Sequence, residues 1–340
     1  MPSDRSTEDG ARAPVLLTDT TYREHAPERE ILGAAGASLL VAEPSLHDEA
    51  ELLAHPRLAE AQGLMVELAP ITAAVLDAAP NCRIVARYGV GLDNVDLDAA
   101  AERAVWVTNV PHYATDTVAD HALALLLAAA RDLAGATARI RAGGWRDVEL
   151  LTTPLLLRDR RLGVIGFGAI GQAVAARGRS FGLRVAAHDP GVPEEAFARL
   201  GVERLALDAL LASSDFVSLH TALTDDTRSL LDDAAIAAMK PGAIVVNTAR
   251  GGLVDEQALL AALDRGQLAR AALDVFEQEP LDADHPLRTH PRVIATPHLA
   301  FWSDGSELTL RRSVAEAVAA VLQDREPPGA VVAGRARAAR

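Results

Sequence analysis

The sequence predicts an α/β protein that folds as two domains, and three observations support this prediction. At 340 residues the chain is long for a single hydrophobic core, so two domains are expected. Short apolar runs alternate with helical segments over most of its length, a pattern typical of parallel sheets covered by helices. The third observation is a glycine-rich turn at residues 166–171, which follows an apolar run and opens a helical segment.

The first half of the chain contains about five short segments with the character of buried strands. They lie at residues 15–17, 38–41, 64–66, 83–87 and 105–107. Helical stretches lie between them, one near residues 24–35 and another from Pro70 onward. Strands that alternate with helices lie parallel in one sheet, so this half is expected to form a parallel sheet sandwiched by helices.

Residues 116–137 are predicted to form one long helix that is almost continuously apolar. A helix facing solvent would carry a polar face, so this helix is expected to be buried between domains or between subunits. The following residues 140–160 have weak periodicity and are interpreted as an excursion or arm. Residues 1–13 and 327–340 are expected to be mobile tails.

The second half opens with a glycine turn of the form G-x-G-x-x-G, made by Gly166, Gly168 and Gly171. Asp189 follows eighteen residues after the last glycine, at the end of a second strand-like run, which completes the fingerprint of a dinucleotide-binding turn. The glycines permit a tight turn, a close approach to a pyrophosphate and close packing of helix on strand. The Asp189 carboxylate would accept the ribose hydroxyls and repel a 2′-phosphate, which favours NAD over NADP. The alternative is an ordinary glycine turn.

The remaining strands of the second half are expected at residues 162–165, 184–188, 215–219, 243–247, 271–275 and 293–295. A last helix at about 305–324 has no strand partner nearby in the sequence. It is therefore expected to cross back and pack on the first domain.

The composition limits the classes of partner. A net charge of −14 argues against nucleic acid and against an anionic membrane surface, while leaving room for a locally basic substrate site. Cys82 is the only cysteine, so no intramolecular disulfide can form and a reducing, cytoplasmic compartment is expected. The longest apolar run, 122–130, is too short to span a membrane, and the N-terminus lacks a signal pattern. No metal site is predicted.

Three consecutive strand ends carry residues suited to catalysis. Arg250 follows the strand at 243–247, Glu279 follows the next strand, and His298 follows the last one. The carboxyl ends of strands in an open α/β sheet are where ligands bind, so the three side chains are expected on one rim. An arginine there can hold a carboxylate through two parallel hydrogen bonds.

Each of these residues taken alone has a structural explanation. An exposed arginine, a solvated acidic loop and a histidine bonded to backbone are all common. Their joint occurrence after a nucleotide fingerprint favours the functional interpretation. The other nine histidines, among them His112, His121 and His188, are given no chemical role.

Several long motifs in one order resemble the D-isomer-specific 2-hydroxyacid dehydrogenases, within the branch of phosphoglycerate-dehydrogenase-like and C-terminal-binding-protein-like members. Besides the glycine turn they are V-A-R-Y-G-V-G-L-D-N-V-D at 85–96, T-N-V-P at 108–111, V-A-D-H-A-L-A-L-L-L at 118–127, N-T-A-R-G-G-L-V-D-E at 247–256, A-L-D-V-F-E-Q-E-P at 272–280 and T-P-H at 296–298. The resemblance covers nearly all of the chain from about Pro80.

The resemblance implies a Rossmann NAD-binding domain at 113–302 that is inserted in a discontinuous, flavodoxin-like substrate domain. The substrate domain would comprise residues 14–112 and 303–326. A homodimer formed through the nucleotide domain and the long helix 116–137 is also implied.

The resemblance assigns a role to each matching residue. Arg250 would orient the substrate, Glu279 would be the acidic partner and His298 the acid/base. Residues expected to contact substrate are Arg87, Tyr88, Gly89, Val90, Gly91 and Phe301. Residues expected to contact the nucleotide are Gly166, Gly168, Ala169, Ile170, Gly171, Asp189, His220, Thr221, Thr248, Ala249, Arg250, Asp274, His298 and Ala300, with Asp274 near the nicotinamide carboxamide.

Two departures from the family pattern concern the substrate. Phe301 and Trp302 stand where many members have small residues, and they either shape a substrate pocket or pack at the domain interface. Glu67 stands where members of the branch often have a neutral polar residue, and in the cleft it would disfavour an acidic substrate tail.

The expected function is reversible hydride transfer between NAD(H) and a small D-2-hydroxy acid or 2-keto acid. His298 would donate a proton to the ketone oxygen, while Glu279 orients the imidazole and favours its charged form. The alternative is an NAD(H)-gated, corepressor-like binding protein with little or no turnover. Formate as the donor is disfavoured, because formate-using relatives carry an amide where this chain has Glu279.

Overall fold

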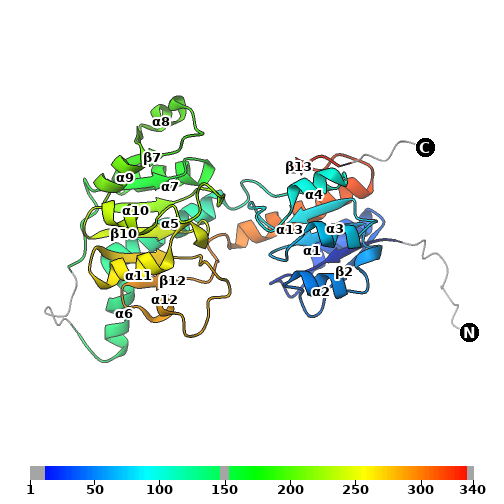
Figure 1. The fold of residues 1–340 in the computed structure, drawn as a ribbon, viewed down its shortest axis with the longest axis horizontal. Coiled ribbons are helices and arrows are strands. Elements are labelled where there is room, and N and C mark those ends of the chain that lie inside the picture. The colour runs from blue at the N-terminus through cyan, green and yellow to red at the C-terminus, as the bar shows by residue number, and fades with distance from the viewer. Residues whose placement is uncertain (1–11, 146–152, 335–340) are drawn as a thin grey trace, which may run out of the picture. The chain divides into compact units, whose positions relative to one another are not determined.

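The computed structural model describes residues 12–145 and 153–334, which form two compact α/β units (Figure 1). Among the described residues, the first unit comprises 12–113 and 303–334, and the second comprises 114–145 and 153–302. The predicted fold class is confirmed, because each unit contains a largely parallel sheet and the second unit interrupts the first in the sequence.

Parts of three predicted segments lie outside the described residues. They are residues 1–11 of the N-terminal tail, residues 146–152 of the arm and residues 335–340 of the C-terminal tail.

The first unit is built on a six-stranded sheet in the order β13-β5-β4-β3-β1-β2. Its parallel strands are β1 (Ala13–Leu17), β2 (Ala37–Val41), β3 (Gly63–Val66), β4 (Ile84–Arg87) and β5 (Trp106–Thr108). Its helices are α1 (Ala26–Ala34), α2 (Glu49–Ala54), the short η1 (Leu58–Glu60), α3 (Ala73–Ala78), α4 (Leu97–Glu102) and α13 (Asp304–Leu322). Helix α13 packs on α1 and on β4, as predicted for the helix without a strand partner.

The prediction that residues 327–340 form a mobile tail is wrong for part of that segment. Ala330–Val332 form strand β13, which pairs antiparallel with β5 at the edge of the sheet. Gly329 has a φ of 71°, and its carbonyl accepts a hydrogen bond from the N–H of Asn109 at 3.2 Å. The turn at this glycine brings the apolar strand onto an edge whose backbone groups would otherwise face solvent.

The second unit is built on a seven-stranded parallel sheet in the order β12-β11-β10-β9-β6-β7-β8. Its strands are β6 (Arg161–Ile165), β7 (Arg184–His188), β8 (Glu203–Arg204), β9 (Phe216–Leu219), β10 (Ala243–Asn247), β11 (Leu268–Leu273) and β12 (Val293–Ala295). Its helices are α5 (Thr115–Arg131), α6 (Leu133–Arg141), α7 (Ala169–Ser180), α8 (Glu194–Leu200), α9 (Leu207–Ser213), α10 (Asp233–Ala238), the short η3 (Gly251–Leu253), α11 (Glu256–Asp264) and α12 (Pro286–Thr289). The two-residue strand β8 was not predicted.

The prediction of one continuous helix over 116–137 is wrong. The helix is interrupted at Asp132, which has a left-handed backbone conformation (φ 51°, ψ 44°) and separates α5 from α6. Aspartate tolerates this conformation better than most residues. The Asp132 carboxylate pairs with Arg270 at 2.8 Å, and both side chains are largely buried, which fixes the break.

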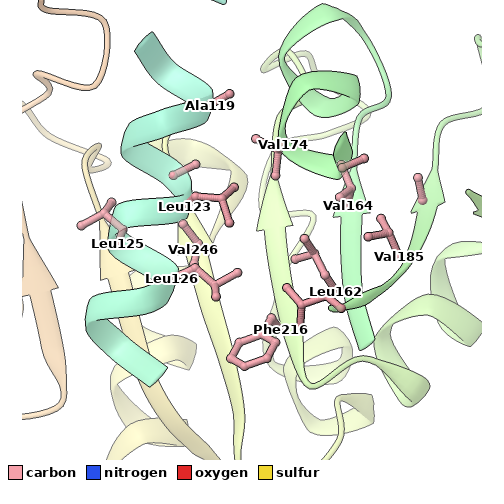
Figure 2. Packing of buried hydrophobic residues seen from close by; sticks show 14 of the residues in the cluster. Ala119, Leu123, Leu125, Leu126, Leu162, Val164, Val174, Val185, Phe216 and Val246 are labelled. Atoms are coloured by element: carbon pink, nitrogen blue, oxygen red, sulfur yellow. The ribbon is translucent and has the colours of Figure 1, made fainter. Parts of the chain in front are cut away.

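Helix α5 supplies much of the apolar core on one face of this sheet. It packs against α7, β10 and β11. Figure 2 shows Leu123 and Leu126 of α5 near Val246 of β10, with Phe216 and Leu162 of the neighbouring strands beside them. All five side chains are buried, so the apolar segment is explained here by burial within its own unit.

Candidate active site

The order of the strands in the second unit reverses beside β6. Strand β6 pairs with β7 on one side and with β9 on the other. Ligands of open α/β sheets bind at the carboxyl ends of the strands at such a reversal. At this point β6 leads through the glycine turn into α7.

The glycine turn has the geometry that its sequence predicts. Gly166 has a φ of 87°, and a Cβ there would lie 2.5 Å from the carbonyl carbon of His220. A Cβ on Gly171 would collide with the carbonyl of Gly166, whereas at Gly168 no atom lies within 4 Å. Helix α7 begins at Ala169, and its N-cap Gly168 has no side chain to accept from the first N–H groups of the helix. These features fit the pyrophosphate of a dinucleotide.

Asp189 lies beside the same turn. Its carboxylate accepts hydrogen bonds from the N–H of Phe167 at 2.7 Å and from the N–H of Gly191 at 2.9 Å. Arg204 donates to the carbonyl of Asp189 at 3.1 Å, and its guanidinium lies 5.1 Å from the centre of the Phe197 ring. The acid at the end of β7 therefore lies next to the phosphate-binding turn, as the fingerprint predicts.

The strands on the other side of the reversal bring further predicted nucleotide residues to this edge. His220 and Thr221 directly follow β9, and the His220 ring bonds to the Ser218 hydroxyl at 2.7 Å. Burial lowers the pKa of His220 to about 3, so its imidazole is neutral. Thr248 follows β10, and within the described residues its buried hydroxyl has no hydrogen-bond partner. Ala249 is the next residue, and Ala169 and Ile170 form the first turn of α7.

Arg250 occupies the loop between β10 and η3. The side chain of Asn247 donates to the carbonyl of Arg250 at 2.8 Å, which ties the loop to the end of its strand. A Cβ at Gly251 would collide with the carbonyl of Phe276, so the loops that follow β10 and β11 are in direct contact. This close approach brings the Arg250 charge near Glu279.

His298 and Glu279 form the predicted pair. His298 Nδ1 lies 2.6 Å from Glu279 Oε2, and Glu279 Oε1 accepts the N–H of Phe276 at 2.9 Å. Burial raises the pKa of Glu279, but the hydrogen bond and charge of His298, the N–H of Phe276 and the charge of Arg250 outweigh it and hold that pKa below its usual value. Because Nδ1 is engaged by Glu279, Nε2 is the ring nitrogen that this contact leaves for another partner.

Asp274 fixes the backbone at His298 and directly after it. Its side chain is completely buried and accepts the N–H groups of Leu299 at 3.1 Å and Ala300 at 2.8 Å. The carbonyl of Asp274 accepts the N–H of His298 at 2.7 Å. His298 has a φ of 49°, a conformation that non-glycine residues adopt only when the surroundings enforce it. These bonds supply that enforcement.

Two residues to which the sequence assigned no role hold Asp274 in turn. The Thr296 hydroxyl donates to Asp274 Oδ1 at 2.5 Å, and His121 Nε2 lies 3.2 Å from the same hydroxyl. Thr296 lies two residues before His298, so the T-P-H motif could have indicated it. His121 comes from α5, far away in the sequence, and no sequence pattern indicates its contact with Thr296.

The aromatic residues after His298 differ in their surroundings. The ring of Phe301 lies 6.3 Å from that of His298, at an angle of 78°. The side chain of Trp302 is 60% exposed. Phe301 is therefore a neighbour of the imidazole, and Trp302 is not packed into the core of its unit.

The predicted substrate loop lies in the first unit, at the end of β4. Arg87 is buried, and a Cβ at Gly89 would collide with its guanidinium, so the glycine leaves room for that side chain. Gly89 also needs a positive φ, of 139°. Val90 and Gly91 follow at the surface of this unit, where Val90 is 45% exposed.

The hydroxyl of Tyr88 is hydrogen-bonded to a buried ion pair formed by Glu28 and Arg311. This hydroxyl donates to Glu28 Oε1 at 3.3 Å, and Glu28 is bound through both oxygens by Arg311, at 2.7 and 2.8 Å. The Arg311 guanidinium lies 4.8 Å from the centre of the Tyr22 ring. The Tyr88 side chain thus points into its own unit.

Comparisons with known proteins identify the family. Residues 123–300 match the model of the D-isomer-specific 2-hydroxyacid dehydrogenase NAD-binding domain. The chain belongs to this family. It is 43% identical over 264 residues to the glyoxylate reductase of Korarchaeum cryptofilum, an alignment that covers 77% of this chain and 80% of that protein.

Two further members of the dehydrogenase family are informative. The chain is 46% identical over 285 residues to the D-3-phosphoglycerate dehydrogenase of Mycobacterium leprae, which covers 84% of this chain and 53% of that protein. It thus spans about half the length of such relatives. Its fold matches the structure of an NADPH-dependent glyoxylate/hydroxypyruvate reductase from Sinorhizobium meliloti with a TM-score of 0.85 and 31% identity, covering 97% of this chain and all of that one. No helix among the described residues combines the length and apolar character needed to cross a membrane.

Proposed function

We propose that this chain catalyses the reversible, NAD(H)-dependent interconversion of a 2-keto acid and a D-2-hydroxy acid. The observation that carries the proposal is the contact of 2.6 Å between His298 and Glu279, next to Arg250, at the carboxyl edge of the sheet that holds the glycine turn. An arginine and an acid-paired imidazole on that edge are suited to bind a carboxylate and to move a proton.

The chemistry divides among these residues. Arg250 binds the substrate carboxylate through two parallel hydrogen bonds and draws charge toward the ketone oxygen. His298, protonated, donates the proton on Nε2 to that oxygen, and Glu279 holds the imidazole through Nδ1. The nicotinamide, when bound, supplies the hydride. In the reverse direction neutral His298 accepts the hydroxyl proton.

The proposal includes NAD as the preferred cofactor. Asp189 lies beside the glycine turn, where its negative charge would repel a 2′-phosphate. Arg204 lies nearby, but it contacts the Asp189 carbonyl and Glu194, whose carboxylate is 3.4 Å away. Its charge is therefore partly balanced.

The proposal assigns a role to each unit. Residues 14–112 with 303–326 form the substrate domain, whose loop at 87–91 would hold the substrate carboxylate. Residues 113–302 form the nucleotide domain. Phe301 would line the substrate pocket, since its ring already faces His298.

The decisive test is a panel of keto acids assayed with NADH and with NADPH. The named relatives suggest two substrate classes, glyoxylate and the phosphorylated three-carbon acid of phosphoglycerate dehydrogenases. Glyoxylate, pyruvate, hydroxypyruvate, 3-phosphohydroxypyruvate and branched, thioether and aromatic keto acids cover these classes and their neighbours. We expect turnover of at least one, with a higher kcat/KM for NADH. NADH binding without turnover of any of them would refute the proposal and favour a nucleotide-gated binding protein.

The variant Glu279→Gln should shift the pH dependence of ketone reduction. The glutamine oxygen can still accept from Nδ1, but the negative charge that favours protonated His298 is gone. Reduction at neutral pH should fall about tenfold, and its alkaline decline should begin at a lower pH. The measurement is kcat/KM for reduction from pH 5 to 9.

The control for this variant is Glu277→Gln, in the same loop. Glu277 accepts the N–H of Glu256 and does not contact His298. An unchanged pH profile in Glu279→Gln would contradict the assigned role of the carboxylate.

A homodimer is part of the proposal, and α6 is its expected contact. No residue of α6 is buried, and Leu133 and Ile140 are each 53% exposed. Leu133 also lines an open hollow on the surface of this helix, together with Ala134, Thr137 and Ala138. An exposed apolar face of this kind is typical of a protein interface.

The variant Ile140→Asp should therefore dissociate the dimer. A buried charge at an apolar contact is costly, so sedimentation should give a dimer for the wild type and a monomer for the variant. Leu308→Asp, at an equally exposed leucine of the first unit (51%), is the matched control and should remain dimeric. A monomeric wild type would refute this part of the proposal.

A cytoplasmic location is also proposed. The sole cysteine, Cys82, is buried, and burial raises the pKa of its thiol to about 12. Such a thiol stays protonated and unreactive, and a chain whose one cysteine is a buried free thiol is expected in a reducing compartment.

A further inference from the structure

The carboxyl edge of the first unit's sheet carries an acid beside the arginine of the substrate loop. Arg87 ends β4 opposite Val66, and Glu67 is the residue that follows Val66 at the end of β3. The N–H of Tyr88 donates to the carbonyl of Val66 at 2.8 Å, so the two strand ends stay in register. The charges of Glu67 and Arg87 interact.

Glu67 is held at this edge by a second acid. The carboxylate of Asp19 is buried and accepts the N–H groups of Glu67 at 3.0 Å, Leu68 at 2.5 Å and Ala69 at 3.0 Å. This fixes the turn after β3. Thr21 donates its own N–H to Glu67 Oε2 at 3.0 Å, which orients the side chain. Hydrogen bonds therefore fix both the backbone and the carboxylate of Glu67 in place.

The charges at this edge leave little attraction for a second anion. Burial raises the pKa of Glu67; the charge of Asp19 adds to the rise, and the hydrogen bonds of Thr21 and the charge of Arg87 oppose it. Burial and, after it, the charge of Glu67 raise the pKa of the Tyr22 phenol. The carboxylates of Asp19 and Glu67 thus lie near the single guanidinium of Arg87. This arrangement favours a ligand that carries one carboxylate over a ligand that carries two negative groups.

We propose that Glu67 selects against substrates with a second negative charge, so that the substrate is a 2-keto acid with an uncharged or cationic tail. The inference rests on the proposed function, in which the 87–91 loop holds the substrate carboxylate. A phosphate or a second carboxylate bound near that loop would lie close to the negative charge of Glu67. Like charges juxtaposed in a binding site are a standard means of rejecting a ligand.

Pairs of keto acids that differ only in tail charge provide the test. Hydroxypyruvate and 3-phosphohydroxypyruvate form one pair, and 2-oxoglutaramate and 2-oxoglutarate form another. For each pair, the ratio of kcat/KM with NADH is measured in the wild type and in Glu67→Gln. The wild type should prefer the member with the uncharged tail. The variant should raise the relative kcat/KM of the anionic member roughly tenfold.

Two controls make the outcome specific. Glutamine keeps an oxygen for the N–H of Thr21, and an unfolding curve verifies that the variant is folded. Glu30→Gln removes the same charge from an exposed position on α1 of the same unit and should leave the ratios unchanged. A wild-type preference for the anionic members, or a ratio that Glu67→Gln does not change, would overturn the inference. Absence of turnover with every keto acid would instead refute the proposed function.

Discussion

The variant His298→Asn should lower kcat for keto-acid reduction by about 10²–10⁴-fold while leaving NADH affinity nearly unchanged. The loss corresponds to about 3–5 kcal/mol of transition-state stabilisation. It follows from removing the imidazole, which would deliver the proton from Nε2 while Glu279 holds its other nitrogen, Nδ1, at 2.6 Å. Stopped-flow reduction and NADH fluorescence titration provide the two measurements.

Asparagine is a better replacement than alanine at this position. His298 has a φ of 49°, and asparagine adopts the left-handed region more readily than most residues. The hydrogen bonds that Asp274 accepts from the backbone of residue 298 and of the two residues after it should therefore persist in the variant. His290→Asn, at a histidine of the same unit that pairs with Asp264, is the matched control. Equal losses of turnover and NADH affinity would identify His298 as a structural residue.

The nucleotide-binding edge could be predicted from the sequence because its determinants are local. The glycine turn, the strand before it and Asp189 all lie within one strand-helix-strand unit. Each of the three strand ends could likewise be located from an apolar run followed by a polar residue. Parallel strands then bring those ends to one edge, so the pair of His298 and Glu279 follows from topology.

Contacts between distant segments could not be predicted in this way. The break between α5 and α6 is held by the ion pair of Asp132 with Arg270, which lies far away in the sequence on β11, and no local pattern pairs these two residues. Strand β13 depends equally on the exposed edge of β5, which its own three residues do not encode.

The support behind His298 illustrates the same limit. Asp274 belongs to a recognisable motif, and the resemblance assigned it to the nicotinamide. In the structure its carboxylate is buried and bonded to Thr296 and to the backbone after His298, with His121 behind Thr296. A role through the backbone of His298 accounts for these contacts. Sequence motifs identify which residues matter at a site, whereas the direction of each side chain depends on packing.

Replacing Arg250 by lysine should reduce kcat/KM about 100-fold, or about 2.7 kcal/mol, with most of the loss in KM. Lysine preserves the charge beside Glu279, but it cannot form two parallel hydrogen bonds to a carboxylate. The variant thus separates the geometry of the guanidinium from its charge.

The pH profile distinguishes this explanation from a purely electrostatic one. Arg250 is one of the charges that hold the pKa of Glu279 below its usual value, and lysine retains that charge. The pH dependence of reduction should therefore match the wild type even though KM rises. Arg265→Lys, at an exposed arginine paired with Asp233, should have wild-type kinetics. If Arg250→Lys shifted the pH profile and left KM unchanged, Arg250 would act on the His298–Glu279 pair and not on the substrate carboxylate.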